Sequence, residues 1–226
     1  MKKLKILFTS IFTITCVTAF SQMSSNECIN HVHVGYGSSS LKSKGYHSED
    51  MKSKTAGNFC MGQTRYSDQI IGTDTRYGLT YDFINITHAQ FDYMQSTNGQ
   101  PDNSEIDNTC VGVSVGGALR FLLNGVLNLT MHAKYQPGYS IMKLQSINGA
   151  SNNKFKGMSN GLSLSCDISF MKCGLGLEYN FNSANYRMGR YDSAINDYYT
   201  NLGQRFGLDK GNINTHSYKV YLAFKF

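Results

Sequence analysis

The sequence predicts an all-β fold, an eight-stranded antiparallel up-and-down barrel that crosses a membrane. Two observations carry this prediction. Apolar and polar residues alternate along eight segments, as in strands whose two faces meet different surroundings. Long and short connections also alternate between these segments, which is the loop asymmetry of membrane barrels. At 226 residues the chain is long enough for one such domain.

The first residues carry an export signal. Three lysines among the first five residues precede an apolar run, and small residues at positions 19 and 21 end it. This three-part pattern predicts a secretory signal peptide over 1–21, then a periplasmic lead over 22–29 and the barrel over 30–226. Without the three signal lysines, the charge is 18 − 15 = +3. So small a value does not favour a nucleic-acid partner.

The alternation places each strand in turn. We expect strands at residues 32–36, 77–83, 89–93, 110–120, 126–136, 160–170, 173–182 and 217–226. The last of them, SYKVYLAFKF, sets five apolar residues from Tyr218 to Phe226 on one face. After the signal, no stretch approaches the roughly 18 apolar residues that a spanning helix needs.

The connections follow from these strands and cover residues 38–73, 84–85, 96–109, 121–125, 137–159, 171–172 and 183–215. The long ones are assigned to the outer side and the short ones to the periplasm. An even number of strands then returns the C-terminus to the periplasm.

Composition decides which face points outward. Small residues such as Gly116 and Ser163 gather on the polar face, and they suit the narrow lumen of an eight-stranded barrel. A lysine on the lipid face would cost roughly 2–4 kcal/mol at the midplane, and the apolar face carries no charge. It is therefore predicted to face lipid. Aromatic residues should mark its edges, with Tyr36, Tyr77, Tyr93, Tyr135 and Tyr218 outside and Phe83, Phe170 and Phe226 at the periplasm.

With these features the chain resembles the small eight-stranded outer-membrane β-barrel proteins of Gram-negative bacteria, the OmpX/OmpA-barrel type. The resemblance covers residues 30–226 and rests on strand number, loop asymmetry and the final SYKVYLAFKF. The stretch GALRFLLNGVLNLTMHAKY is also similar to their strand–turn–strand units. The resemblance implies outer-membrane lipid as a partner, and the barrel assembly machinery as a reader of the strand that ends at Phe226.

Charged residues on the interior face are expected to form a structural network of opposite charges. The candidates are His31, His33, Arg76, Asp82, Arg120, Asp167, Glu178, Lys219 and Lys225, and the same face includes His88, Asp92, His132 and Lys134. A conducting pathway is the alternative, for which eight strands leave little room. His31 and His33 with Asp82 can also supply metal ligands. We expect hydrogen-bonded histidines instead, clustered with Asp82 and Lys225, and no metal or cofactor.

The cysteines leave a disulfide open. Five follow the signal, so at least one is unpaired in a monomer. Cys60 and Cys110 both lie toward the outer side and can pair in an oxidising compartment. Cys166 and Cys173 are expected to act as small lipid-facing residues.

The outer loops are the most informative functional feature. The last loop concentrates Tyr and Arg, the residue types favoured in recognition surfaces. The expected partner-binding residues are Tyr186, Arg187, Arg190, Tyr191, Tyr198, Tyr199 and Arg205, which would meet an extracellular ligand or host surface. No loop spacing forms a nucleophile–base set, so no catalytic residue is assigned. We therefore expect a non-enzymatic role in envelope structure or surface interaction. The alternatives are a lipid-A-modifying enzyme and a soluble lipocalin-like binder.

Overall fold

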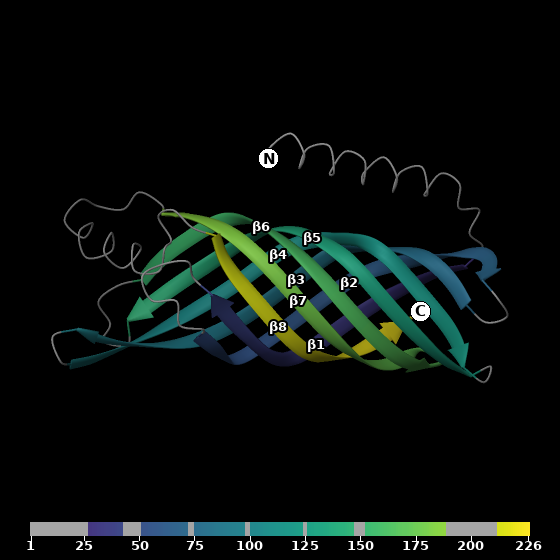
Figure 1. The fold of residues 1–226 in the computed structure, drawn as a ribbon, viewed down its shortest axis with the longest axis horizontal. Helices are drawn as coiled ribbons and strands as arrows, with labels where there is room; N and C mark the ends of the chain where they lie inside the picture. Colours follow the sequence, from purple (N-terminus) through teal and green to yellow (C-terminus); the bar gives the residue numbers. More distant parts are fainter. Residues whose placement is uncertain are drawn as a thin grey trace.

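The computed structural model describes residues 27–42, 51–71, 75–97, 100–123, 126–146, 152–188 and 212–226, which form one closed barrel (Figure 1). Its strands are β1 (Glu27–Lys42), β2 (Met51–Ile71), β3 (Thr75–Thr97), β4 (Gln100–Leu123), β5 (Leu127–Ser146), β6 (Asn152–Phe170), β7 (Cys173–Met188) and β8 (Asn212–Lys225). Each strand pairs antiparallel with the next, and β8 pairs with β1. The predicted fold class, an all-β eight-stranded up-and-down barrel, is confirmed. No helix among the described residues is long and apolar enough to span a membrane.

The barrel closes between its first and last strands. His31 pairs with Lys225 and Lys42 with Asn214 in the β1–β8 register. Asn30 N donates to Phe226 O at 2.9 Å, and Phe226 N donates to Asn30 O at 3.0 Å. Closure removes the unpaired strand edges that would otherwise invite association. β1 begins at Glu27, so the barrel starts three residues before the predicted boundary at residue 30.

Two strand predictions are wrong. One strand was missed and another was counted as two, so the predicted total of eight strands is still correct. The predicted loop 38–73 contains β2, and the predicted turn 84–85 lies inside the single strand β3. β2 escaped notice because only Phe59 and Met61 give its outer face an apolar stretch, between lysines on one side and Gln63 and Arg65 on the other. Most residues of the predicted loops 96–109 and 137–159 also belong to strands.

A β-bulge explains the split of β3. Phe83 and Ile84 are consecutive and both face outward, and the register with β4 shifts between Asp82 and Asn85. An extra residue of this kind reverses the face of every residue that follows it. Phe91 is therefore buried inside the barrel, although the sequence predicts it on the lipid face.

His88 and Asp92 are predicted inside, and this too is wrong, because both are exposed after the bulge. Tyr77 is also misplaced. It lies near the start of β3, at the end of the barrel that holds Phe226, and not at the opposite rim. We call the end that holds Phe226, the last residues of β2 and β4 and the turn at 171–172 the inner end, and the opposite end the outer end.

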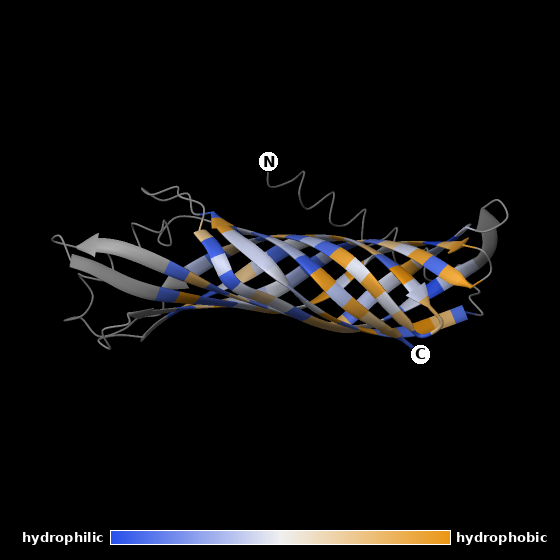
Figure 2. Cartoon of the chain, turned by 90° about the horizontal axis from the view of Figure 1, so that it is seen from below, coloured by the Kyte–Doolittle hydropathy of each residue, from blue (hydrophilic) through white to orange (hydrophobic). Residues whose placement is uncertain are grey.

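The polarity of the wall reverses along the barrel. Figure 2 shows the apolar residues gathered over the half that holds the C-terminus. This apolar belt consists of exposed residues, among them Val34, Phe59, Val111, Val113, Leu119, Met131, Tyr139, Met158, Leu162, Leu164, Ile168, Leu175, Leu177, Val220, Leu222 and Phe224. Toward the outer end the exposed residues are polar, including Lys52, Lys54, Lys143, Lys154 and Lys156.

Inside the outer end, apolar side chains replace polar ones. They form a buried cluster, the outer core, made of Leu41, Ala56, Ala89, Phe91, Ile106, Met142, Phe155, Ala184, Tyr186 and Ile213. All eight strands contribute to it. The sequence alone predicts one apolar face outward along the whole strand, whereas the structure has two zones with opposite arrangements.

Candidate functional site

The lumen below the outer core is filled by charged side chains, beginning at the inner end. Arg120 donates two hydrogen bonds to the Glu27 carboxylate, at 2.8 and 2.7 Å, and Arg76 donates a third. The paired geometry of a guanidinium and a carboxylate makes this a strong contact. The Arg120 guanidinium also lies 4.3 Å from the ring centroid of Tyr66, a cation–π arrangement.

A second group centres on Asp82, which is buried in the middle of the lumen. Lys134 Nζ donates to its two oxygens at 2.9 and 3.2 Å, and His31 Nε2 lies 2.8 Å from Oδ1. Ser114 donates to Oδ2. Four groups from β1, β3, β4 and β5 thus satisfy one another, as buried charges require.

A third group centres on Asp167 of β6. Lys225 Nζ lies 2.6 Å from Asp167 Oδ1 and also donates to Ser169 and Thr130. His132 Nε2 lies 3.5 Å from Oδ2 of the same carboxylate. The predicted cluster is confirmed in part: Lys225 lies opposite His31 in the β1–β8 register and lines the same cavity as His31 and His33, but its ammonium group pairs with Asp167 and not with Asp82.

Glu178 lies at the centre of the charged group nearest the outer core. Its carboxylate accepts hydrogen bonds from Asn58 at 2.5 Å and Ser163 at 2.8 Å. Lys219 lies opposite it in the β7–β8 register and is buried, but its Nζ has no hydrogen-bond partner among the described residues.

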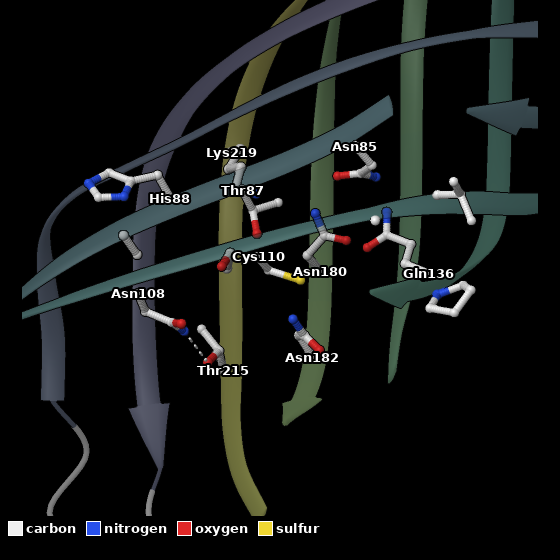
Figure 3. Close-up of a pocket in the computed structure, with 15 residues that line it drawn as sticks. Asn85, Thr87, His88, Asn108, Cys110, Gln136, Asn180, Asn182, Thr215 and Lys219 are labelled. Atoms are coloured by element: carbon white, nitrogen blue, oxygen red, sulfur yellow. Dashed lines mark hydrogen bonds between the residues drawn. The ribbon is translucent and has the colours of Figure 1, made fainter. Parts of the chain in front are cut away.

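A small polar cavity of about 30 Å³ lies beside Lys219 (Figure 3). Residues of β3, β4, β5, β7 and β8 surround it, and Asn108 donates to Thr215 across it at 3.5 Å. The amide groups of Asn180 and the Nε2 of Gln136 are buried without a partner among the described residues. A volume of this size suits water molecules, which can bridge such groups. It does not suit an organic substrate.

The lumen histidines stack with one another. The ring centroids of His31 and His33 are 4.8 Å apart, and His33 stacks on Tyr221 at 4.7 Å. A cavity of about 180 Å³ adjoins these rings at the inner end. Within the described ranges, no three His, Cys, Asp or Glu side chains are arranged to hold a metal ion. The arrangement fits aromatic packing and hydrogen bonding.

Apart from His88 and Asp92, the predicted lumen residues line this interior, from Arg76 at the inner end to Lys219 near the outer core. Sequence reasoning missed the acid that pairs with Arg76 and Arg120. Glu27 was assigned to the periplasmic lead because it precedes the first apolar alternation, but it belongs to β1. Glu27 lies four residues before His31, so the two side chains share one face of a strand. This spacing is the signal in the sequence that could have placed Glu27 inside the barrel.

The predicted partner-binding patch is only partly within the described structure. Tyr186 is 2% exposed and belongs to the outer core, where its hydroxyl contacts Ser140 at 2.6 Å and Asn108 at 2.8 Å. The prediction that it meets a partner is therefore wrong. The backbone of Arg187 lies in β7. The remaining predicted positions, Arg190, Tyr191, Tyr198, Tyr199 and Arg205, lie outside the described residues.

The described cysteines are all free thiols. Cys60 is buried in the lumen wall, and Cys110 contacts Ser159 with its sulfur 3.1 Å from Oγ. Cys166 and Cys173 share the outward faces of β6 and β7 with exposed apolar residues such as Leu164 and Leu175. The disulfide that the sequence leaves open between Cys60 and Cys110 is not formed in this structure.

No protein-family model and no curated protein matches the chain. Among solved structures, Neisserial surface protein A aligns at 13% identity over 87% of this chain and 97% of its own, with a TM-score of 0.49. Ail, the attachment invasion locus protein of Yersinia pestis, aligns at 14% over 88% and 99%, with a TM-score of 0.42. The outer-membrane protease OmpT from Escherichia coli aligns at 9% over 91% and 98%, with a TM-score of 0.47.

Proposed function

We propose that this chain is a non-enzymatic outer-membrane β-barrel protein with a structural or surface-interaction role. Its apolar belt lies in the bilayer, and its outer end projects beyond the membrane. Partners, an extracellular ligand or a host surface, would meet the outer end and its connections. Export would depend on the signal over residues 1–21.

The reversal of polarity along the wall is the observation that carries this proposal. In the belt, Leu177 is 65% exposed and Leu162 is 57% exposed, while Asp82 and Lys134 are buried inside. At the outer end, Phe91 and Phe155 are buried at 0% and 1%. A barrel wholly in water would not leave so broad an apolar band exposed. A barrel with lipid around one half and water around the other accounts for both zones.

The contents of the lumen favour this role over the alternatives. A soluble lipocalin-like binder needs an apolar cavity for its ligand, whereas ion pairs and the outer core cross this interior and charged side chains line the cavity of about 180 Å³ at its inner end. For a lipid-modifying enzyme, catalytic groups should meet at the outer rim of the belt. There the exterior histidines His88 and His216 bond to Thr109 and Tyr179, at 2.9 and 2.8 Å. Neither contact joins a nucleophile to a base and an acid.

Fractionation with gel migration before and after boiling tests the proposal. We expect the protein in the outer-membrane fraction, with a band that moves on boiling because a closed barrel resists detergent. Intact cells treated with a membrane-impermeant amine reagent should be modified at Lys54 and Lys154 and not at Lys134. A periplasmic protein with unchanged migration would refute the membrane assignment, and a change in lipid A mass on gene deletion would favour the enzyme.

A further inference from the structure

One lysine is buried in the lumen with no counter-charge in contact. Lys219 of β8 is 3% exposed, and its Nζ has no hydrogen-bond partner among the described residues. Removing an isolated ammonium group from water is very costly. The other buried lumen lysines are paired, since Lys134 and Lys225 lie 2.9 and 2.6 Å from aspartate oxygens. Lys219 therefore needs a partner that the described side chains do not supply.

The acid opposite Lys219 does not fill this role. Glu178 faces Lys219 in the β7–β8 register. Its Oε1 accepts a hydrogen bond from Ser163 at 2.8 Å, and its Oε2 accepts one from Asn58 at 2.5 Å. Both carboxylate oxygens are thus bonded to other groups, while Lys219 Nζ stays without a contact among the described side chains.

The cavity of about 30 Å³ beside Lys219 has the composition of an anion site. Among the described residues that line it, Lys219 is the cation, and there is no aspartate or glutamate. Amide side chains make up much of the remaining wall, as Figure 3 shows, and they are Asn85, Asn108, Gln136, Asn180 and Asn182. Amide nitrogens donate hydrogen bonds to anions. A cation with amide donors and no carboxylate attracts a negative charge and repels a positive one.

Two of these amides have donors that are free for such a ligand. The Nε2 of Gln136 and the Nδ2 of Asn180 are buried without a partner among the described residues. Asn180 is opposite Ser217, which makes it a diagonal neighbour of Lys219. Diagonal neighbours are about 7–8 Å apart, within reach of a long side chain. The unpartnered oxygens of Asn180 and Asn182 fit the same arrangement, because an ammonium group has three donors and can contact an oxygen as well as an anion.

We propose that this cavity holds a chloride ion between Lys219, Gln136 and Asn180. The volume admits only a particle of about the size of a water molecule, so phosphate, sulfate and organic carboxylates are too large. The three donors come from β8, β5 and β7, so the ion would join strands that are not neighbours. The site goes beyond the proposed surface role, because the ion would supply a counter-charge inside the wall whether or not a partner binds outside.

Crystals of the full-length protein grown in bromide test the site, because bromide can replace chloride and gives an anomalous scattering peak. We expect a peak in the cavity beside Lys219. Lys219→Met removes the cation and should lose the peak. Asn180→Asp should lose it too, since the new carboxylate becomes an internal partner for Lys219. Lys54→Met is the matched control, because Lys54 is an exposed lysine on the outer wall, and it should keep the peak.

Urea unfolding gives a second measurement. A ligand that binds only the folded state stabilises it by mass action. Replacing gluconate with chloride at constant ionic strength should therefore raise the urea midpoint of the unaltered protein and of Lys54→Met. The midpoints of Lys219→Met and Asn180→Asp should not respond.

Two outcomes would overturn the site. One is a cavity that contains water only, with no anomalous peak in bromide. The other is the same chloride response in Asn180→Asp as in the unaltered protein. The gel shift on boiling confirms that each variant is folded, and Asn180→Asp serves alone if Lys219→Met does not fold.

Discussion

The ammonium group of Lys134 lies 2.9 Å from the Asp82 carboxylate, in a part of the lumen where both side chains are almost fully shielded from solvent. The pair links β5 to β3 across the barrel interior. The burial of this ion pair makes it important for stability, because a buried charge that loses its partner has no water molecule to replace that partner.

Replacing Asp82 with asparagine tests this dependence. Asp82→Asn keeps the shape of the side chain but leaves Lys134 without a counter-charge, and we expect the free energy of unfolding to fall by about 3–5 kcal/mol. The fraction of heat-shifted band against urea concentration measures it. Asp92→Asn is the control, because its partner Lys54 is exposed and surface ion pairs contribute little. Equal effects of the two substitutions would contradict the buried role.

The outer core should contribute stability as the core of a water-soluble protein does. Phe155→Ala removes a fully buried side chain, and we expect a loss of about 3–5 kcal/mol in the free energy of unfolding. Phe170→Ala is the matched change on the same strand, where the ring is half exposed in the apolar belt, and it should cost less. A larger loss at Phe170 than at Phe155 would count against a packed outer core.

Two glycines offer a comparison of inside and outside. A Cβ on Gly176 would overlap the ring of Tyr221, the residue opposite it in the β7–β8 register. Gly117 has nothing within 4 Å of the corresponding position. We expect Gly176→Val to destabilise the barrel by about 1–3 kcal/mol through overpacking. Gly117→Val should be tolerated. Urea titration of both variants decides, and similar midpoints would show that Tyr221 can move aside freely.

The filled lumen predicts that the barrel does not conduct ions. Ion pairs cross the interior at Asp82 and Asp167, and the outer core closes the end above them. In planar lipid bilayers we expect no stepwise current from the reconstituted protein. Discrete current steps that persist after repurification would show that the interior opens. They would favour the alternative that the barrel is an ion-conducting pathway.

The last four strands could be predicted from sequence because their alternation is strong and uninterrupted. In β6, for example, Leu162, Leu164 and Ile168 alternate with serines and Asp167, and each residue faces the side that this pattern predicts. β2 could not be found in the same way, because two apolar residues do not establish a period. Its pairing with β1 and β3, a non-local contact, is what defines it as a strand.

The face of a residue is harder to predict than its strand. Counting alternate residues along the sequence does not detect the bulge at Phe83 and Ile84. This bulge nevertheless places Phe91 inside the barrel and Asp92 outside. The ion pairs of the lumen depend on register across several strands. Sequence patterns could assign Asp82 and Asp167 to the interior, but only the register assigns Lys134 to one and Lys225 to the other.

The hydrogen bonds between Asn30 and Phe226 have a consequence for the time course of folding. They join the two strands that are farthest apart along the chain, so the contact that completes the wall requires the largest loop to close. Such distant pairings slow the search for the native state. Until β8 arrives, β1 presents an open edge together with half of an apolar belt. The time before β8 pairs with β1 is therefore the period when misassembly competes with folding.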